Sequence, residues 1–382
     1  MSRSTPLHGV HESLGATMVD FAGWRMPLRY GSESAEHRAV RTAAGLFDLS
    51  HMGEIFVTGP QAPAALDHAV VSRVSRLAPG RARYTMLCAP DGGVLDDLIV
   101  YRLSAEEFLV VANAANAERV AAELAARADG YDAAVADRSA AHALLAVQGP
   151  RSAEVLAAAG VADADLGDLR YYAVRPAKVA GIGALVARTG YTGEDGFELF
   201  VAADDAVRLW RALAAAGEPY GLCPAGLAAR DTLRLEAGMP LYGNELTTEG
   251  TPFDAGLGRV VDFGDPGEPR EFVGRAALEA ARDAADGPRR RLVGLVARGR
   301  RVPRHGYPVV NAADGAVVGE VTSGAPSPTL GKPIAMAYLT GPAIGRMIGN
   351  VADERIDGLA VDIRGRHEPV DVVDLPFYRR NR

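Results

Sequence analysis

Residues 94–101 read Val-Leu-Asp-Asp-Leu-Ile-Val-Tyr, a run of mostly apolar and β-branched residues that predicts a β-strand. The stretch before it, 89–93, reads Ala-Pro-Asp-Gly-Gly and has the composition of a tight turn. A further apolar run, residues 83–88, precedes the turn, so we expect an antiparallel hairpin. Side chains alternate along a strand, which places Asp97 and Tyr101 on the same face.

The doubled aspartate in this strand, Asp96 and Asp97, is unusual. Aspartate is depleted from strands, and a buried carboxylate is costly unless it is paired. Two interpretations stay open on the residues alone. Either one aspartate caps the hairpin while the other is solvated, or Asp97 has a chemical role.

Helices and strands alternate on both sides of this hairpin, which predicts an α+β fold with a largely antiparallel sheet. A helix is expected over residues 34–42, with Gly45 as the glycine that ends it. The other helices are expected at 61–71, 115–128, 151–159, 203–216 and 225–238, and the other strands at 54–58, 107–111, 131–136, 142–148, within 171–188 and at 197–202.

The pattern changes after residue 288, where short strands separated by Gly and Pro predict an all-β barrel or sandwich. The domain boundary is expected between 265 and 288, with a helix over 276–285. The expected strands are 291–297, 307–311, 316–322, 334–339, 359–363 and 370–373.

The composition of the 382-residue chain excludes several classes of protein. With 48% hydrophobic and 23% charged residues, it is a folded chain of roughly two to three domains. Two cysteines cannot form a disulfide framework, and the histidines show no metal-binding spacing. A net charge of −7 argues against a nucleic-acid binder. We find neither a membrane-spanning apolar run nor a signal peptide, and so expect a cytoplasmic protein.

Charge is unevenly distributed along the chain. Residues 288–382 carry 15 Lys and Arg against 9 Asp and Glu, a net charge of +6, whereas the remainder carries 26 against 39, a net charge of −13. This asymmetry indicates either a surface for a charged partner or ordinary solvated arginines.

Two further segments contain candidate functional residues. The stretch 189–198 reads Thr-Gly-Tyr-Thr-Gly-Glu-Asp-Gly-Phe-Glu, a tight loop that enters a strand with Glu198 inside it. Glu198 is either a functional carboxylate or a solvated position on an edge strand. In the helix at 225–238, Arg230 and Arg234 lie one turn apart and suit a carboxylate ligand, although on the residues alone a salt-bridged surface helix is favoured.

Together, six long motifs resemble the aminomethyltransferase family, the T-proteins of the glycine cleavage system. The resemblance extends from about residue 5 to residue 378. The motifs are MVDFAGWRMPL at 18–28, GLFDLSHMG at 45–53, GGVLDDL at 92–98, RTGYTGE at 188–194, ARDTLRLEAG at 229–238 and TSGAPSPTLG at 322–331.

The resemblance implies a three-domain cloverleaf arrangement with mixed and antiparallel sheets around a folate pocket, ending in a β-barrel-like domain. Its first α+β domain, residues 1–50 plus 138–265, would bind folate and be interrupted by a second α+β domain, residues 51–137. Residues 266–287 would form a linker and helix, and 288–382 the all-β C-terminal domain.

The resemblance also implies an activity. An aminomethyl group on the dihydrolipoyl arm of the H-protein gives its one-carbon unit to tetrahydrofolate, with release of ammonia. Asp97 is then the candidate catalytic carboxylate, because a fixed negative charge stabilises the cationic carbon that develops during transfer. The candidate folate-binding residues are Glu198, Arg230, Tyr84, Tyr101, Tyr191, Asn113 and Met52.

Two other activities occur on this fold. One is folate-dependent demethylation of small methylated amines or sulfonium compounds, and the other is a non-catalytic folate-binding role in iron–sulfur assembly. The second is disfavoured because its Lys-Gly-Cys-Tyr signature is missing here. As H-proteins tend to be acidic, the resemblance favours the basic C-terminal region as a partner surface, with arginines at 289–291, 298, 300, 301 and 304.

Overall fold

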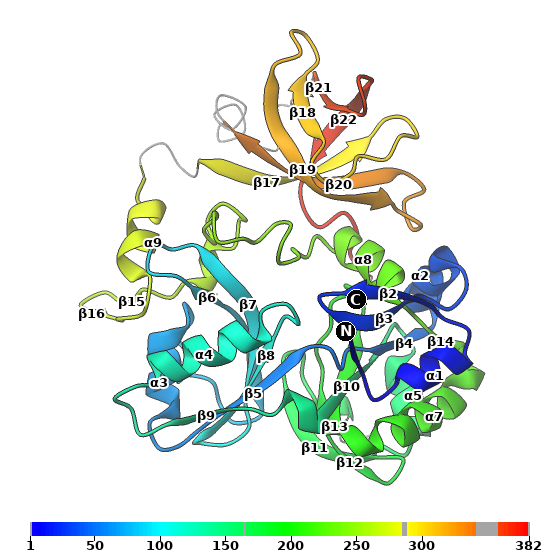
Figure 1. Cartoon of the computed structure of the whole chain (residues 1–382), viewed down its shortest axis with the longest axis vertical. Helices are drawn as coiled ribbons and strands as arrows, with labels where there is room; N and C mark the ends of the chain where they lie inside the picture. Colours follow the sequence, from blue (N-terminus) through cyan, green and yellow to red (C-terminus); the bar gives the residue numbers. More distant parts are fainter. Residues whose placement is uncertain (1, 163–165, 285–288, 341–357, 381–382) are drawn as a thin grey trace. The chain divides into compact units, whose positions relative to one another are not determined.

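The computed structural model describes residues 2–162, 166–284, 289–340 and 358–380, in two compact units. The first unit comprises Met1–Leu87, Leu95–Asp231 and Gly264–Val273. The second comprises Cys88–Val94, Thr232–Phe263 and Gly274–Arg382. The elements of both units are labelled in Figure 1.

The first unit contains a sheet with the strand order β11-β12-β13-β10-β4-β14 over the described residues. Neighbouring strands are antiparallel except β14, which runs parallel to β4. We call this the first sheet. Its strands are β4 (Ala44–Asp48), β10 (His142–Gln148), β11 (Val174–Val179), β12 (Ile182–Ala187), β13 (Gly196–Ala202) and β14 (Leu222–Pro224).

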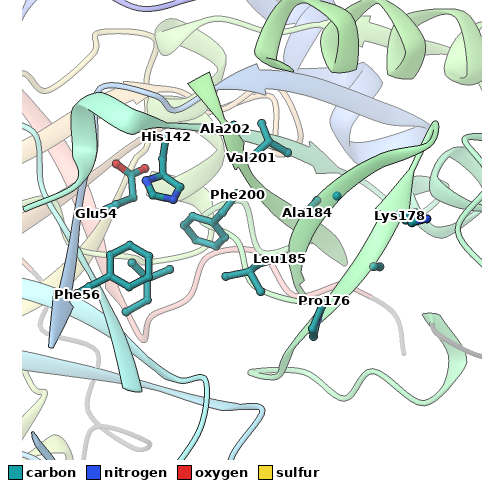
Figure 2. A pocket seen from close by; sticks show the side chains of 13 residues that line it. Glu54, Phe56, His142, Pro176, Lys178, Ala184, Leu185, Phe200, Val201 and Ala202 are labelled. Atoms are coloured by element: carbon teal, nitrogen blue, oxygen red, sulfur yellow. The ribbon is translucent and has the colours of Figure 1, made fainter. Parts of the chain in front are cut away.

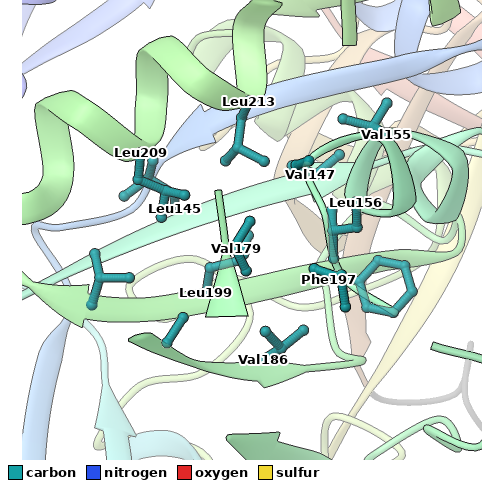
Figure 3. Close-up of a cluster of buried hydrophobic side chains, with 14 of the residues drawn as sticks. Leu145, Val147, Val155, Leu156, Val179, Val186, Phe197, Leu199, Leu209 and Leu213 are labelled. Carbon is teal, nitrogen blue, oxygen red and sulfur yellow. The ribbon is translucent and has the colours of Figure 1, made fainter. Parts of the chain in front are cut away.

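Helices α5 (Ser152–Ala158) and α7 (Ala206–Gly217) cover one face of the first sheet (Figure 3). Alternate strand residues such as Leu145 and Leu199 point to this face and pack against Leu209 and Leu213 of α7. Truncating one such buried leucine to alanine costs about 2–5 kcal/mol of stability. The opposite face, which carries Glu198 and Phe200, is thereby left for the second sheet.

The second sheet of the first unit has the strand order β6-β7-β8-β5-β9. Helices α3 (Ala62–Ala69) and α4 (Ala117–Arg127) pack on one face, against residues such as Ile55 and Val100. Its other face carries Glu54, Phe56, Asp97 and Tyr101, in agreement with the predicted alternation. The strands are β5 (Gly53–Thr58), β6 (Arg81–Cys88), β7 (Val94–Arg102), β8 (Glu107–Ala112) and β9 (Ala134–Asp137).

Shorter elements complete the first unit. A small sheet has the order β1-β3-β2, and β15 pairs with β16. These elements are β1 (Arg3–Ser4), α1 (His8–Ser13), β2 (Thr17–Phe21), β3 (Trp24–Arg29), α2 (Glu33–Thr42), β15 (Gly264–Asp265) and β16 (Glu268–Pro269).

The second unit contains a closed barrel with the strand order β17-β20-β19-β18-β21-β22. Its interior is filled by apolar side chains such as Leu295, Val321 and Ala337. The unit also contains α9 (Arg275–Arg282) and the end of α8 (Leu227–Glu236). The barrel strands are β17 (Arg290–Ala297), β18 (Pro308–Asn311), β19 (Val317–Pro326), β20 (Pro333–Thr340), β21 (Leu359–Asp362) and β22 (His367–Val373).

The α+β class, the hairpin around 89–93 and the C-terminal barrel are confirmed. The role expected for Gly45 is wrong. The helix ends at Thr42, and Gly45 lies inside β4, where an added Cβ would stand 2.5 Å from Val40 Cγ2. The glycine is needed for close packing rather than for a left-handed turn. The predicted division into three domains stays a prediction. No described helix is long and apolar enough to cross a membrane.

Candidate functional site

Tyr101 connects the two sheets of the first unit through their inner faces. Its hydroxyl lies 2.9 Å from Thr189 Oγ1 and donates a hydrogen bond of 3.2 Å to Glu198 Oε2. The Tyr101 ring meets Phe200 edge to face, with 5.5 Å between ring centroids. The sheets therefore face each other across a layer that contains both predicted carboxylates, Asp97 and Glu198.

Asp97 is half-buried and held by two predicted site residues. Tyr84 donates its hydroxyl to Asp97 Oδ2 at 3.0 Å, and Asn113 Nδ2 donates to Oδ1 at 2.8 Å. Burial, and then the negative charge of Asp97, raise the pKa of Tyr84 well above its usual range, so its hydroxyl remains a donor. These two hydrogen bonds fix the Asp97 carboxylate in position.

Asp96 points to the opposite face of β7 and is fully buried. It accepts hydrogen bonds from the Asn113 backbone at 3.0 Å and from Asn116 Nδ2 at 2.7 Å. Burial, and then the charge of Asp97, raise the pKa of Asp96 to about 7. Asp96 therefore anchors the start of β7 on the face opposite to Asp97. Neither of the two aspartates is a solvated turn residue.

Glu198 lies on β13, between β12 and β10, so it is not an edge-strand position. Thr189 also donates to Oε2. In the described part of the chain both bonds to the Glu198 carboxylate go to Oε2, which leaves Oε1 open to a donor from a ligand. A carboxylate held in this way suits a ligand with adjacent N–H donors.

Gln148 explains why the loop before Glu198 is rich in glycine. A Cβ added at Gly190 or Gly196 would stand 2.0 or 2.4 Å from atoms of the Gln148 side chain. That side chain accepts from Thr192 Oγ1 at 3.0 Å and donates to the Thr189 carbonyl at 3.1 Å. The loop thus folds tightly around one amide, which positions Thr189 against Glu198.

Arg230 and Tyr191 form the third part of the site. The Arg230 guanidinium carbon lies 4.7 Å from the centroid of the Tyr191 ring, a cation–π geometry. Burial, and then the charge of Arg230, lower the pKa of the neighbouring His51 to about 4, so His51 is neutral at pH 7. The predicted arginine therefore places a positive charge beside an aromatic wall.

Arg234 has a different role from Arg230, although both lie on α8. It belongs to the second unit, where it is 1% exposed. Its guanidinium donates to Glu245 Oε2 at 2.9 Å and to Ser323 Oγ at 2.7 Å. Arg234 is therefore salt-bridged, as the alternative interpretation expected, but it is buried and does not lie on a surface helix face.

Comparisons with known proteins assign the chain to a family. The family model described as "GCVT N-terminal domain" matches residues 7–265, and "Glycine cleavage T-protein C-terminal barrel domain" matches 290–379. The chain belongs to the glycine cleavage T-protein family of aminomethyltransferases.

The similarity to members of the T-protein family covers the whole chain. An aminomethyltransferase of Streptomyces coelicolor is 64% identical, covering 100% of this chain and 98% of the relative. One of Streptomyces avermitilis is 62% identical with the same coverage. A solved structure, the glycine cleavage system aminomethyltransferase T from Bartonella henselae, has a TM-score of 0.87 and 36% identity, covering 99% of this chain and 98% of that one. The resemblance stated from the motifs is confirmed.

Tyr172 is a further candidate for this site that sequence reasoning missed. It is bulky yet has φ 58°, a left-handed conformation that costs energy and often marks functional sites. Burial and the charges of Glu198 and Asp97, among other causes, raise the pKa of its hydroxyl, which places the ring near both carboxylates. The doubled Tyr171-Tyr172 was visible in the sequence, but nothing there distinguishes a strained site residue from the start of a strand.

The predicted site residues thus gather around two carboxylates. Tyr84 and Asn113 donate hydrogen bonds to Asp97, and Tyr101 donates one to Glu198. Tyr191, which stacks on Arg230, also acts electrostatically on Tyr84, the partner of Asp97. Met52 follows His51 in the turn after β4 and is half-buried. Its assignment to a folate pocket stays a prediction.

Proposed function

We propose that this protein transfers the one-carbon unit from the aminomethyl-dihydrolipoyl arm of an H-protein to tetrahydrofolate. The products are 5,10-methylenetetrahydrofolate, ammonia and the reduced lipoyl H-protein. Membership of the T-protein family supports the proposal, as do full-length relatives named aminomethyltransferases. A cytoplasmic location is part of the same proposal.

The observation that carries the proposal is a pair of carboxylates on facing sheets. Asp97 and Glu198 are each held by neutral donors, Tyr84 and Asn113 for one, and Tyr101 and Thr189 for the other. Neutral donors fix the geometry of a carboxylate without cancelling its charge. One carboxylate can then bind a ring system while the other acts at the reacting carbon.

Glu198 fits the pterin ring of tetrahydrofolate. That ring has an N–H beside an exocyclic amino group, and the open side of the Glu198 carboxylate accepts such a donor pair. Tyr84, Tyr101 and Tyr191 supply flat aromatic walls, as a ring ligand requires. When bound, the folate supplies the nitrogen that accepts the one-carbon unit.

Asp97 has the chemical role in this proposal. Its fixed negative charge stabilises cationic character at the transferred carbon, and it can orient or deprotonate the amine. Asp96, whose pKa is raised to about 7, is neutral in a large fraction of molecules near neutral pH.

The replacement of Asp97 by asparagine tests this role. We expect D97N to retain tetrahydrofolate binding and to lose roughly 10²–10⁴-fold in turnover, the usual worth of a general acid or base. Asp204→Asn, at an exposed position, is the matched control and should leave both unchanged. Normal turnover in D97N with tight folate binding would remove Asp97 from the mechanism.

A substrate comparison separates the proposal from the other activities of this fold. Turnover should require lipoylated H-protein bearing the aminomethyl group together with tetrahydrofolate. Activity only with free dimethylglycine would identify a demethylase instead. Folate binding without turnover of either donor would identify a binding protein.

The basic surface of the barrel unit is the proposed docking site for the H-protein. Among its arginines, Arg298 lies 2.7 Å from Asp371 and Arg301 lies 3.5 Å from Glu368, so part of the charge is neutralised within the unit. Arg300 and Arg304 are exposed and are the better test positions. The double variant Arg300→Glu with Arg304→Glu should slow H-protein association and flatten its salt dependence. An unchanged association rate would contradict this docking site.

A further inference from the structure

A cavity of about 600 Å³ lies in the first unit, at the other end of the layer between its two sheets. Its lining includes Glu54, Phe56, His142, Leu185 and Phe200 (Figure 2). The volume is within the range of sites that hold small organic ligands, about 300–1,000 Å³. We call Asp97, Glu198 and the side chains that donate hydrogen bonds to them the Asp97 and Glu198 cluster: Tyr84, Asn113, Tyr101 and Thr189. No residue of this cluster lines the cavity, so the proposed function gives the cavity no role.

Glu54 is the unusual member of this lining. Its side chain lies in the cavity wall beside His142 (Figure 2), and the residue is only 1% exposed. Within the described ranges, neither of its carboxylate oxygens has a hydrogen-bond partner. Buried carboxylates are almost always paired, because an unpaired one loses its hydration without compensation. A bare carboxyl in the wall of a cavity is therefore best explained by a partner that comes from outside the chain.

The backbone of Glu54 is held firmly in place. Its N–H donates to Ser139 Oγ at 2.9 Å, and its carbonyl accepts from the Arg138 N–H at 3.0 Å. Glu54 is placed on the cavity side because β5 alternates, with Ile55 and Val57 pointing into the opposite core. The place of the Glu54 side chain in the cavity wall thus follows from the alternation of the strand.

The electrostatic surroundings favour a cationic partner. Burial, with the nearby charges of Asp137 and Asp48, raises the pKa of the Glu54 carboxyl well above its usual range. The same negative surroundings attract a positive group. The guanidinium of Arg138 stacks 4.9 Å from the centroid of Phe56, and Lys178 lies on the far side of the lining from Glu54 (Figure 2). Neither cation is paired with the carboxyl.

The rest of the wall suits an apolar body. Phe56 and the His142 ring lie 5.4 Å apart at 30°, and the His142 Nδ1 is directed to the Arg138 carbonyl at 3.0 Å. Leu185 and Phe200, paired across β12 and β13, complete an apolar floor. Aromatic faces also attract cations, which reinforces the preference set by Glu54.

We propose that this cavity is a second ligand site, which binds a small organic cation, an amine or amidine with an apolar body. The cationic head donates its N–H groups to Glu54, and the body lies against Phe56, Leu185 and Phe200. The site is distinct from the Asp97 and Glu198 cluster and does not depend on the reaction proposed there.

Calorimetric titration of the full-length protein with benzamidine tests the site. Benzamide is the neutral control of the same shape, and benzoate the anionic one. We expect benzamidine to bind at least 10-fold more tightly than either. Glu54→Gln should remove this preference, and Glu106→Gln, at an exposed position, should retain it. Leu185→Trp, which fills the floor, should remove binding of benzamidine while the protein stays folded.

Three results would overturn the proposal. The first is equal benzamidine affinity in the wild type and Glu54→Gln. The second is no binding of benzamidine by the wild type up to millimolar concentration. The third is loss of binding in Asp97→Asn or Glu198→Gln with retention in Glu54→Gln, since the cation would then occupy the other carboxylate site.

Discussion

The carboxylates at the two ends of the layer between the sheets of the first unit differ in their hydrogen bonding. At one end, Asp97 and Glu198 each accept hydrogen bonds from at least two side chains. At the other, Glu54 accepts none within the described residues, although it is more deeply buried than Asp97. The sequence pattern is the same in each case, an acid at an inward-facing position of a strand. Hydrogen-bond donors within the chain, rather than burial, therefore distinguish a preorganised carboxylate from one that needs an external ligand.

After Asp97→Asn, the largest expected effect of breaking this contrast is at Glu198. Glu198→Gln replaces an acceptor with an amide that also has donors, which conflicts with the donors of the pterin ring. Hydrogen bonds to charged groups contribute about 1.5–3 kcal/mol, so folate affinity should fall roughly 10- to 150-fold. Fluorescence or calorimetric titration measures this loss. The control Glu218→Gln, at an exposed position, should bind folate normally; equal loss in both variants would contradict the role of Glu198.

Glu54 should show the opposite response, a gain in stability. Glu54→Gln removes an unpaired acid and should raise the free energy of unfolding by about 1–3 kcal/mol at pH 8. The folded-state pKa lies above the ordinary value of 4.5, so the wild type loses stability as pH rises from there through the folded pKa. The advantage of the variant should therefore shrink towards pH 4.5.

Chemical denaturation at several pH values measures this difference. Equal pH profiles for the wild type and Glu54→Gln would show that Glu54 is satisfied in solution. Other charged and titratable groups near Glu54 are present in both proteins, so their effects should cancel in the difference between the two free energies of unfolding. These groups are Asp48 on β4, Asp137 on β9, Arg138 after it, His142 on β10 and Lys178 on β11.

Tyr84→Phe tests how much one hydrogen-bond donor to Asp97 contributes to turnover. It removes the hydroxyl that donates to Asp97 at 3.0 Å but retains the aromatic wall. A single lost bond of about 1.4 kcal/mol corresponds to a roughly 10-fold loss in turnover. Steady-state kinetics should show this loss in kcat, with folate affinity within a few-fold of the wild type. An effect on affinity alone would assign Tyr84 to binding rather than to the position of Asp97.

The smallest expected effect is at Asp137, which acts on Glu54 without contact. Its carboxylate is exposed, so solvent and salt screen its charge. Asp137→Asn should weaken benzamidine binding by no more than about 3-fold at low salt, and the difference should vanish in about 1 M salt, where the Debye length is only about 3 Å. A large effect that persists in salt would mean that Asp137 contacts the ligand directly.

Local patterns in the sequence were enough to predict much of the fold. The turn at 89–93 and the alternation after it correctly placed Asp97 and Tyr101 on one face, because a strand repeats every two residues whatever its surroundings. The short C-terminal strands separated by Gly and Pro predicted an all-β barrel or sandwich, and the family resemblance implied the barrel. The motifs were also sufficient for the family, since six of them in order are specific.

The tertiary structure decided what each face meets. Tyr101 reaches Glu198 across 97 positions of sequence, and no local pattern contains that pairing. A glycine three residues after a predicted helix suggests a helix end, yet Gly45 lies inside β4, where the close packing of the Val40 side chain leaves no room for a Cβ. Glu54 reads as an ordinary surface acid in an amphipathic strand. Only the packing of one sheet on the other removes water from its carboxyl, because burial depends on which distant surface covers a residue and not on the residue itself.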